Sequence, residues 1–430
     1  MQQDKNCPAF FAGGTEQRGR CASETGYGWN SGGSDDAVPA DGLRQQGHGR
    51  DRGRKALRSR NSGPETAQDI PAEGLYADLT GIAQNAVAAT LGDTEFPAEF
   101  YFYWLGYSCS SLEYFLLTNQ DGNGYTDCVD TDTGTIDWTG SYNGVPLMEY
   151  TRAQTEGILA YYAAVEQLAA ENGVVLTEDD RAELQASAES AADELGGEEA
   201  FAGYLKTMGI SRTTYDRINA VDFLNEDLLR ALVSEDGSMF LTDDACAEMT
   251  IYADQILIPT TNLWTGAELS TEEVAQKKAL AEDLMSQIRA AEDPEAAFDE
   301  LSEQYNQDPN RSENPDGFFY IKGYSSGMMP QEAETEAARL KEGEISDLVK
   351  SEYGYHIVLR RDVRTALEAN PNLRGDIAEE CLASLVAERK DSLKADYASE
   401  LDGVEWTTFY DRYQAEAERL DAELGVDTAE

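Results

Sequence analysis

Histidine is scarce in this sequence, and so are the residue patterns that bind transition metals. The 430 residues include only His48 and His356, and the six cysteines are scattered without a Cys-x-x-Cys pair. Because zinc sites are built from clustered cysteine and histidine, we expect no metal site, and we expect no cofactor. Imidazole chemistry in the folded chain then depends on His356, since His48 lies in a segment without a sustained apolar period.

Basic residues are also few. The chain has 33 Lys and Arg against 82 Asp and Glu, a net charge of −49. Residues 1–65 hold ten basic and eight acidic residues, which leaves 23 basic and 74 acidic residues for the rest. Such a polyanion repels phosphate groups, so nucleic acid is excluded as a partner. The charge favours basic or unfolded polypeptides instead.

Long apolar runs are missing as well. No stretch of about 18 apolar residues is present, so the sequence predicts no transmembrane segment. Residues 1–20 lack the apolar core of a signal peptide, and no export signal is visible. For Cys109 and Cys128 two interpretations stay open, a disulfide in an oxidising compartment or buried free thiols.

Composition and apolar periodicity divide the chain into four parts. Residues 1–70 are rich in Gly, Arg, Ser and Gln, which indicates a disordered tail or a misread gene start. Residues 71–245 are mainly helical. Thr177 caps a helix that Gly196 and Gly197 end, and Ser211 caps another that runs to Val233. Helices joined by such short turns form a bundle.

The apolar pattern of residues 246–365 predicts strands as well as helices, and that of residues 366–430 is helical again. Strands are predicted over 252–258, 318–321, 345–349 and 355–360. Helices are predicted after the capping box at Ser270, after Asp293-Pro294 and over 331–340. The order is β-α-α-β-α-β-β. We therefore predict an α+β protein: a helical bundle made by both ends of the chain, with a small antiparallel sheet and its helices inserted between them.

Several motifs inside this inserted part resemble, in order and spacing, the parvulin-type peptidyl-prolyl isomerases. The resemblance covers residues 250–362 and is specific. The segment before it, with Leu176-Thr177-Glu178-Asp179, is more loosely similar to the chaperone region of bacterial extracytoplasmic foldases of this superfamily. The motifs are Gln255-Ile256-Leu257-Ile258, Phe298-x-x-Leu301-x-x-x-Tyr305-x-x-Asp308, Leu340-x-x-Gly343-Glu344-Ile345-Ser346 and Tyr353-Gly354-Tyr355-His356-Ile357.

The resemblance implies four polar site residues. His356 matches the closing histidine of the family, Asp308 its Asp or Cys position, and Ser351 the hydroxyl near the last strand. Gln255 stands where the family usually has a histidine. Gln255 can hydrogen-bond to His356, although it cannot carry a proton.

The resemblance also implies an apolar slot for a proline ring. Met329 matches the family's methionine, and Leu257 with Phe318 or Phe319 are candidates for the rest of the wall. Ala333 replaces the phenylalanine that the family has four residues after the methionine. Burying a Phe-sized group contributes about 1.5–3 kcal/mol, so we expect a pocket opened at Ala333 and a weakened isomerase.

Rotation about an Xaa-Pro bond meets a barrier of about 18–20 kcal/mol, and lowering it requires no covalent step. The resemblance therefore implies a foldase that isomerises Xaa-Pro bonds in unfolded or partly folded exported clients. By the same resemblance its location is the cell envelope or the extracellular space. The alternative is a chaperone whose parvulin domain has lost catalysis, as Gln255 and Ala333 suggest.

Overall fold

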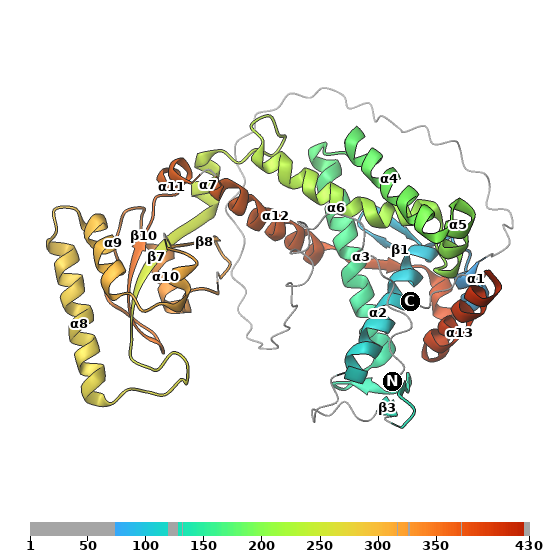
Figure 1. Ribbon diagram of the computed structural model, residues 1–430, viewed down its shortest axis with the longest axis horizontal. Helices are drawn as coiled ribbons and strands as arrows, with labels where there is room; N and C mark the ends of the chain where they lie inside the picture. The colour runs from blue at the N-terminus through green and yellow to red at the C-terminus, as the bar shows by residue number, and fades with distance from the viewer. Residues whose placement is uncertain are drawn as a thin grey trace.

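A computed structural model describes residues 74–118, 128–130, 132–315, 317–325, 327–370 and 372–424 of the chain. These residues form helices and small antiparallel sheets, which confirms the predicted α+β class. The predicted tail at residues 1–70 lies outside the described residues. Figure 1 shows two parts, a helical body and a smaller sheet-containing part joined to it through α7, α11 and α12.

The helical body begins with six helices, and the predicted caps form at two of them. Thr177 and Asp180 form a capping box before α4, and Gly196 ends that helix in the left-handed conformation with φ 99°. Ser211 caps α6 by accepting a hydrogen bond from the Thr214 N–H. The helices are α1 (Leu75–Thr80), α2 (Ala98–Thr118), α3 (Leu147–Asn172), α4 (Glu178–Leu195), α5 (Glu198–Thr207) and α6 (Arg212–Val233).

The C-terminal segment returns to this body, as predicted. In α13 (Trp406–Leu424), Phe409 stacks on Phe102 with ring centroids 5.4 Å apart, and Tyr413 stacks on Tyr76 at 6.0 Å. Strand β11 (Ala395–Tyr397) pairs with β1 (Val87–Leu91), which also pairs with β2 (Thr94–Pro97). The other elements are α11 (Val363–Ala369), α12 (Leu373–Ser392), the 3-10 helix η3 (Ser399–Gly403) and the short strands β3 (Val129–Asp130), β4 (Thr135–Ile136), β5 (Ser141–Tyr142) and β6 (Val145–Pro146).

The inserted part is built on a four-stranded sheet of order β8-β7-β10-β9. Its elements follow the predicted order, but the strand predicted over 345–349 is reduced to an isolated bridge at Ile345 and a short strand at 349–350. Both predicted caps form, with a capping box at Ser270 and Glu273 and an N-cap at Asp293. The elements are α7 (Asp243–Met249), β7 (Thr250–Pro259), α8 (Thr271–Ala290), α9 (Pro294–Tyr305), η2 (Pro309–Ser312), β8 (Phe318–Ile321), α10 (Gln331–Arg339), β9 (Val349–Lys350) and β10 (Gly354–Arg360).

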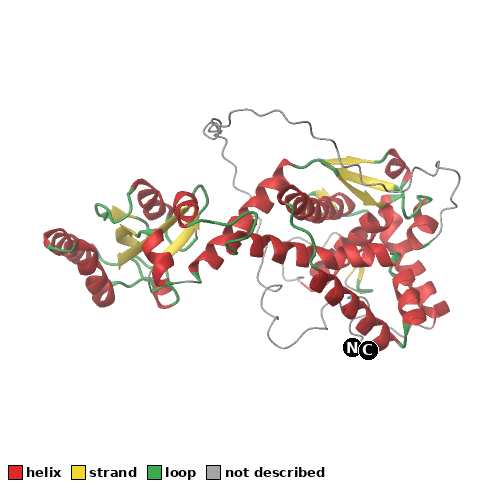
Figure 2. Cartoon of the chain, turned by 90° about the horizontal axis from the view of Figure 1, so that it is seen from above, coloured by secondary structure: helices red, strands yellow, loops and turns green. Residues whose placement is uncertain are grey.

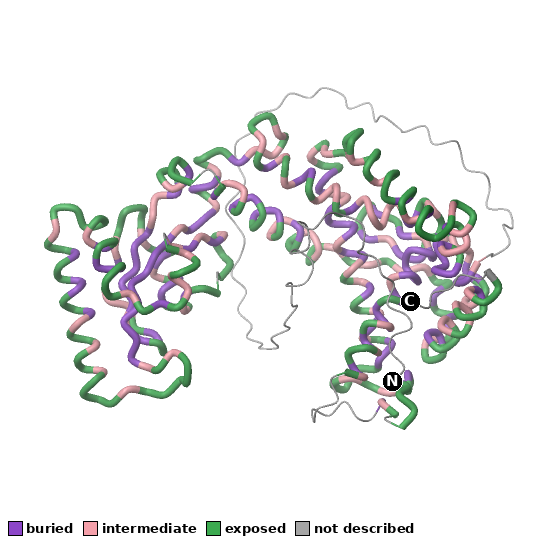
Figure 3. The backbone as a smooth tube through the Cα atoms, viewed as in Figure 1, coloured by how far each residue is buried: buried purple, intermediate pink, exposed green. Residues whose placement is uncertain are grey.

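The two faces of this sheet bury two separate cores, because side chains alternate along a strand. In the central pair, His356 lies opposite Leu257 and Val358 lies opposite Gln255. Ile256 and Ile357 belong to the core that packs on α8 and α9. The other face is covered by α10, and Figure 3 shows the central strands as the most buried segment of this part.

The motif that opens β10 contains Gly354, and the structure explains why this position needs a glycine. A Cβ at this position would lie 2.3 Å from the carbonyl oxygen of Ile258 on the neighbouring strand. Any larger residue would push β10 away from β7. The glycine therefore sets how closely the strand that carries His356 pairs with β7.

The inserted part rests on the helical body through β8. Phe319 and Ile321 pack against the core of the body, and the Tyr324 hydroxyl donates to Glu388 of α12 at 3.1 Å. Figure 2 shows the same joint from above. Cys109, Cys128, Cys246 and Cys381 are buried and outside any disulfide, so the thiol interpretation of Cys109 and Cys128 is the one that the structure shows. Among the described residues, none of the helices combines the length and the apolar character needed to cross a membrane.

Candidate functional site

The four predicted polar residues lie in one continuous hydrogen-bonded chain. Ser351 Oγ is 2.6 Å from His356 Nε2, and His356 Nδ1 is 2.8 Å from Gln255 Oε1. Gln255 Nε2 donates to Asp308 Oδ2 at 2.6 Å. The expected bond between Gln255 and His356 is thus confirmed, and the sheet brings together residues that are up to 101 positions apart.

The direction of this chain follows from which atoms can only accept. An amide oxygen has no hydrogen, so His356 Nδ1 donates to Gln255 Oε1. The neutral imidazole then has its lone pair on Nε2, which accepts the Ser351 hydroxyl hydrogen. Ser351 Oγ accepts in turn from the Tyr353 N–H at 3.1 Å, and Asp308 Oδ1 accepts from the Asn310 N–H at 2.9 Å. The Ser351 hydroxyl, the His356 Nδ1–H and one N–H of the Gln255 amide are therefore all used inside the chain.

Burial keeps the imidazole neutral. His356 is fully buried, and desolvation, with a smaller contribution from the positive charge of Lys350, lowers the pKa of His356 from 6.5 to about 4. At neutral pH the ring is therefore an uncharged link that fixes Ser351 and Gln255. The exposed fractions of Ser351, Asp308 and Gln255 are 5%, 8% and 2%, so only the two ends of the chain approach the surface.

An apolar cluster lies on the same face of the sheet. Met329, Phe318 and Ala333 are buried in it together with Val358 of β10. Leu257 is 4% exposed and pairs directly with His356 across the strands. These side chains lie on the His356 face of the sheet, where the wall for a proline ring is predicted.

Phe319 requires a correction. It pairs with Tyr252, whereas Phe318 pairs with Ala253. Neighbouring residues of a strand point to opposite faces, so Phe319 points away from His356 and packs against the helical body. The assignment of Phe319 to the apolar wall is therefore wrong, and Phe318 keeps that place.

The prediction of a pocket opened at Ala333 is also wrong. Ala333 has no exposed surface and sits on the inner face of α10, against the sheet. Helix and sheet have closed over the smaller side chain, so the missing ring leaves no opening at this position. A phenyl ring added to this backbone would have to displace its neighbours.

Asn306 is a structural residue of the site that the sequence reasoning missed. Its Nδ2 donates to the Gln255 carbonyl at 2.7 Å, and its Oδ1 accepts from the N–H groups of Leu257 and Asp308 at 2.9 and 3.0 Å. It therefore ties the loop that carries Asp308 to the strand that carries Gln255. In this segment the sequence motifs identify Asp308 and give Asn306 no role, although Asn is a residue that bonds nearby backbone.

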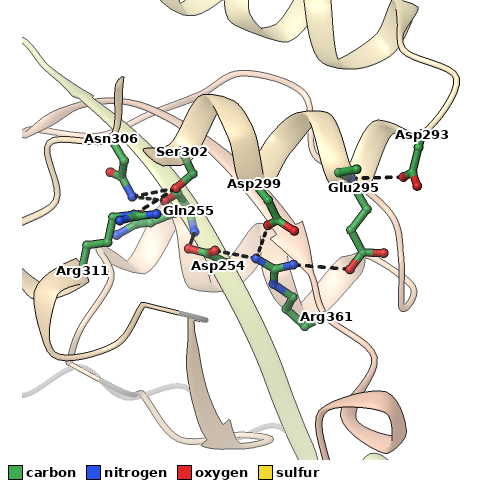
Figure 4. A network of polar contacts seen from close by, with 10 residues as sticks. Asp254, Gln255, Asp293, Glu295, Asp299, Ser302, Asn306, Arg311 and Arg361 are labelled. Atoms are coloured by element: carbon green, nitrogen blue, oxygen red, sulfur yellow. Dashed lines mark hydrogen bonds and ion pairs between the residues drawn. The ribbon is translucent and has the colours of Figure 1, made fainter. Parts of the chain in front are cut away.

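An ion-pair network holds β7 from the opposite face of the sheet (Figure 4). Arg361 donates to Asp254 at 2.8 Å and to Asp299 of α9 at 2.6 Å. Burial raises the pKa of the Asp254 carboxyl, and Arg361 partly offsets this. The side chain of Asp254 also accepts from the Gln255 N–H at 2.7 Å. The backbone of Gln255 is thus fixed by Asp254 and by Asn306.

A groove flanks the site between α10 and β9. It has a volume of about 560 Å³. Gln331 at one border lies two positions after Met329, and Lys350 at the other directly precedes Ser351. The residues that line it are Gln331, Glu332, Thr335, Glu336, Arg339, Asp347, Leu348, Val349 and Lys350.

Comparison with known proteins finds a family model that matches this region. Residues 256–362 match the family described as Rotamase, the PPIC-type PPIASE domain. The foldase protein PrsA of Geobacillus kaustophilus is 36% identical over 77 residues, which is 18% of this chain and 26% of that protein. The foldase protein PrsA of Bacillus subtilis is 31% identical over 110 residues, 25% of this chain and 35% of that protein. The matched segments therefore span about a quarter to a third of these relatives.

Solved structures resemble the chain at lower identity. A crystal structure of the peptidylprolyl isomerase PrsA from Bacillus anthracis is 18% identical and covers 61% of this chain and 97% of that one, with a TM-score of 0.21. One of two SurA-like chaperones of Campylobacter jejuni is 16% identical and covers 54% and 94%, with a TM-score of 0.19.

Proposed function

We propose that this protein is a peptidyl-prolyl cis-trans isomerase that assists the folding of exported polypeptides, because residues 256–362 form a PPIC-type PPIase domain. The observation that carries the proposal is the hydrogen-bonded chain Ser351–His356–Gln255–Asp308 beside Met329 and Phe318 on one face of the sheet. An apolar wall next to fixed polar atoms is what binding and twisting of a prolyl bond requires.

The apolar wall binds the proline ring. Met329, Leu257 and Phe318 present no hydrogen-bond donors, so a prolyl bond held against them loses the water that hydrates its carbonyl. The planar amide is stabilised by resonance that puts negative charge on the carbonyl oxygen, and the twisted transition state has less of that charge. Desolvation therefore disfavours the planar ground state more than the twisted state.

The polar chain acts in the same direction through acceptor atoms. The Ser351 hydroxyl hydrogen is engaged by His356 and one lone pair of its oxygen by the Tyr353 N–H, so Ser351 presents its remaining lone pair to a bound peptide. Acceptor atoms near the carbonyl oxygen of the prolyl bond oppose its charge and so favour the twisted state. Gln255 preserves this arrangement without carrying a proton, because the mechanism needs a fixed neutral His356 and no proton transfer.

The remainder of the chain serves the clients. We assign residues 246–365 to the isomerase, and residues 71–245 with 366–430 to a helical body that holds unfolded or partly folded polypeptides containing Xaa-Pro bonds. The relatives named foldase support this assignment. We place the protein in the cell envelope or outside the cell, and mass spectrometry of the mature protein from fractionated cells tests that location.

The catalytic proposal is tested with a refolding protein whose slow phase is limited by an Xaa-Pro bond. The rate of that phase should rise in proportion to the concentration of this protein. Met329→Ala should lower the effect by about ten- to a hundredfold, since burial of such a side chain contributes about 1.5–3 kcal/mol. Met328→Ala is the matched control, because that side chain is 46% exposed. A slow phase that never accelerates would contradict the proposal.

A further inference from the structure

Trp264 stands out among the apolar side chains of the protein. Its exposed fraction is 91%, the highest of any large apolar residue in the described ranges. It lies in the loop between β7 and α8, which Figure 1 shows at the end of the sheet farthest from α7 and α11. Indole groups are enriched at binding surfaces because they bury a large area at low conformational entropy cost.

The loop that carries Trp264 is held in one conformation. Thr261 and Glu268 form an antiparallel bridge, and the Asn262 N–H donates to the Ala267 carbonyl at 2.8 Å. The side chain of Asn262 accepts from the N–H groups of both Trp264 and Thr265 at 3.0 Å. The indole is therefore presented to solvent by a hydrogen-bonded turn, and binding through it would cost little ordering of the loop.

This loop is joined to the turn that holds Ser351. The Thr260 N–H donates to the Tyr353 carbonyl at 2.9 Å, and Lys350 Nζ donates to Thr260 Oγ1 at 3.0 Å. Tyr353 itself donates its N–H to Ser351 Oγ and is 44% exposed. The Cα of Trp264 is at most about 11 Å from that of Thr261, a distance that three to four residues of extended chain span.

The charge around Trp264 selects the kind of partner. Residues 260–275 include three glutamates and no lysine or arginine. Anionic lipid surfaces are repelled by this segment, whereas a lysine or arginine side chain is attracted by the glutamates and by the face of the indole. An apolar side chain is favoured by burial against the ring.

We propose that Trp264 is a client-binding residue that takes an apolar or basic side chain of an extended polypeptide, a few residues from the prolyl bond held beside Ser351. The inference rests on the proposed isomerase function and specifies its substrate: a chain that continues beyond the proline and is apolar or basic there. Trp264 thereby gives the isomerase a preference for such segments over short prolyl peptides.

The test compares two peptide series with the full-length protein. One peptide is a short Ala-Pro core, and the others extend it with a Phe-Lys pair placed two, four, six or eight residues from the proline on either side. Exchange NMR measures kcat/KM for isomerisation, and indole emission reports burial of Trp264. Trp264→Phe identifies its emission among the tryptophans, and Val175→Ala is the control for loss of an exposed apolar group, since Val175 is 66% exposed.

We expect kcat/KM for the best extended peptide to exceed that for the short core by about tenfold, which is the contribution of a single residue that is important for binding. The ratio should fall to near one in Trp264→Ala, stay intermediate in Trp264→Phe and stay at the wild-type value in Val175→Ala. The emission of Trp264 should shift to shorter wavelength with the extended peptides.

A wild-type ratio retained in Trp264→Ala, or no emission shift, would overturn the inference. A shift with zwitterionic phosphatidylcholine vesicles but not with peptides would overturn it in favour of a membrane contact. If neither peptide is isomerised but extended peptides still shift the Trp264 emission, the catalytic proposal fails while the binding role of Trp264 stands.

Discussion

Replacing Gln255 by leucine tests the polar chain at its centre. The substitution removes the acceptor of the His356 Nδ1–H and the donor to Asp308 Oδ2, while an apolar side chain one heavy atom shorter remains. The two atoms that lose their partner, His356 Nδ1 and Asp308 Oδ2, belong to residues that are at least nine-tenths buried. Leaving a buried polar group unpaired costs about 1–3 kcal/mol, so the two together cost about 2–6 kcal/mol. Domains are stable by about 5–15 kcal/mol, so the loss is a large part of the total.

Urea unfolding followed by the NMR signals of β10 measures this loss directly. Gln307→Leu provides the control, because Gln307 is a neighbouring glutamine with an exposed side chain. Its stability should stay within about 0.5 kcal/mol of the wild type. If Gln255→Leu also stays within that range, the hydrogen-bonded chain does not hold the site together, and our account of it is refuted.

Two further experiments, a substitution at Ala333 and a titration of His356, test the neighbouring residues. Ala333→Phe should lower the free energy of unfolding of the domain by about 1–3 kcal/mol, because the site is closed. The control Thr335→Phe, on the exposed side of α10, should be nearly neutral. Equal urea midpoints for the two variants would indicate an open pocket at Ala333. His356 should titrate near pH 4 in imidazole NMR, with its proton on Nδ1 at pH 6. Because the unfolded chain binds that proton near pH 6.5, about 3 kcal/mol of stability present above pH 6.5 should be lost as the pH falls to 4; a midpoint above pH 6 would contradict the assignment.

Local signals in the sequence were enough to predict most elements of the fold. The capping boxes at Thr177 and Ser270 and the glycine stop at Gly196 each depend on atoms a few residues apart. The chemistry of these positions is therefore complete in a short stretch of chain. The return of the C-terminal helix was predictable because this amphipathic segment is too short to bury its own aromatic side chains, of which Phe409 packs on Phe102.

The residues of the site could be predicted from the sequence, but which way some of their side chains point could not. Motif spacing identified Gln255 and His356, and the antiparallel register then brought them together. Which of Phe318 and Phe319 faces the site depends on the pairing of β8 with β7, and a shift by one residue would reverse it.

Packing across the sheet was the part that sequence reasoning could not reach. Counting from Met329 identified Ala333, but how closely α10 approaches the sheet is set by contacts with residues distant in the chain, such as Val358. Asn306 was not identified for a related reason. A turn residue and a residue that ties a loop to a strand have the same local pattern, and only the position of β7 distinguishes them.

Exchange NMR on a short peptide with a single Ala-Pro bond tests the central claim most directly. The account predicts that the folded wild-type protein accelerates cis-trans exchange far above the rate in buffer, and that Gln255→Leu at the same concentration does so much less. Exchange at the buffer rate, in a sample whose β10 signals show the folded sheet, would contradict it.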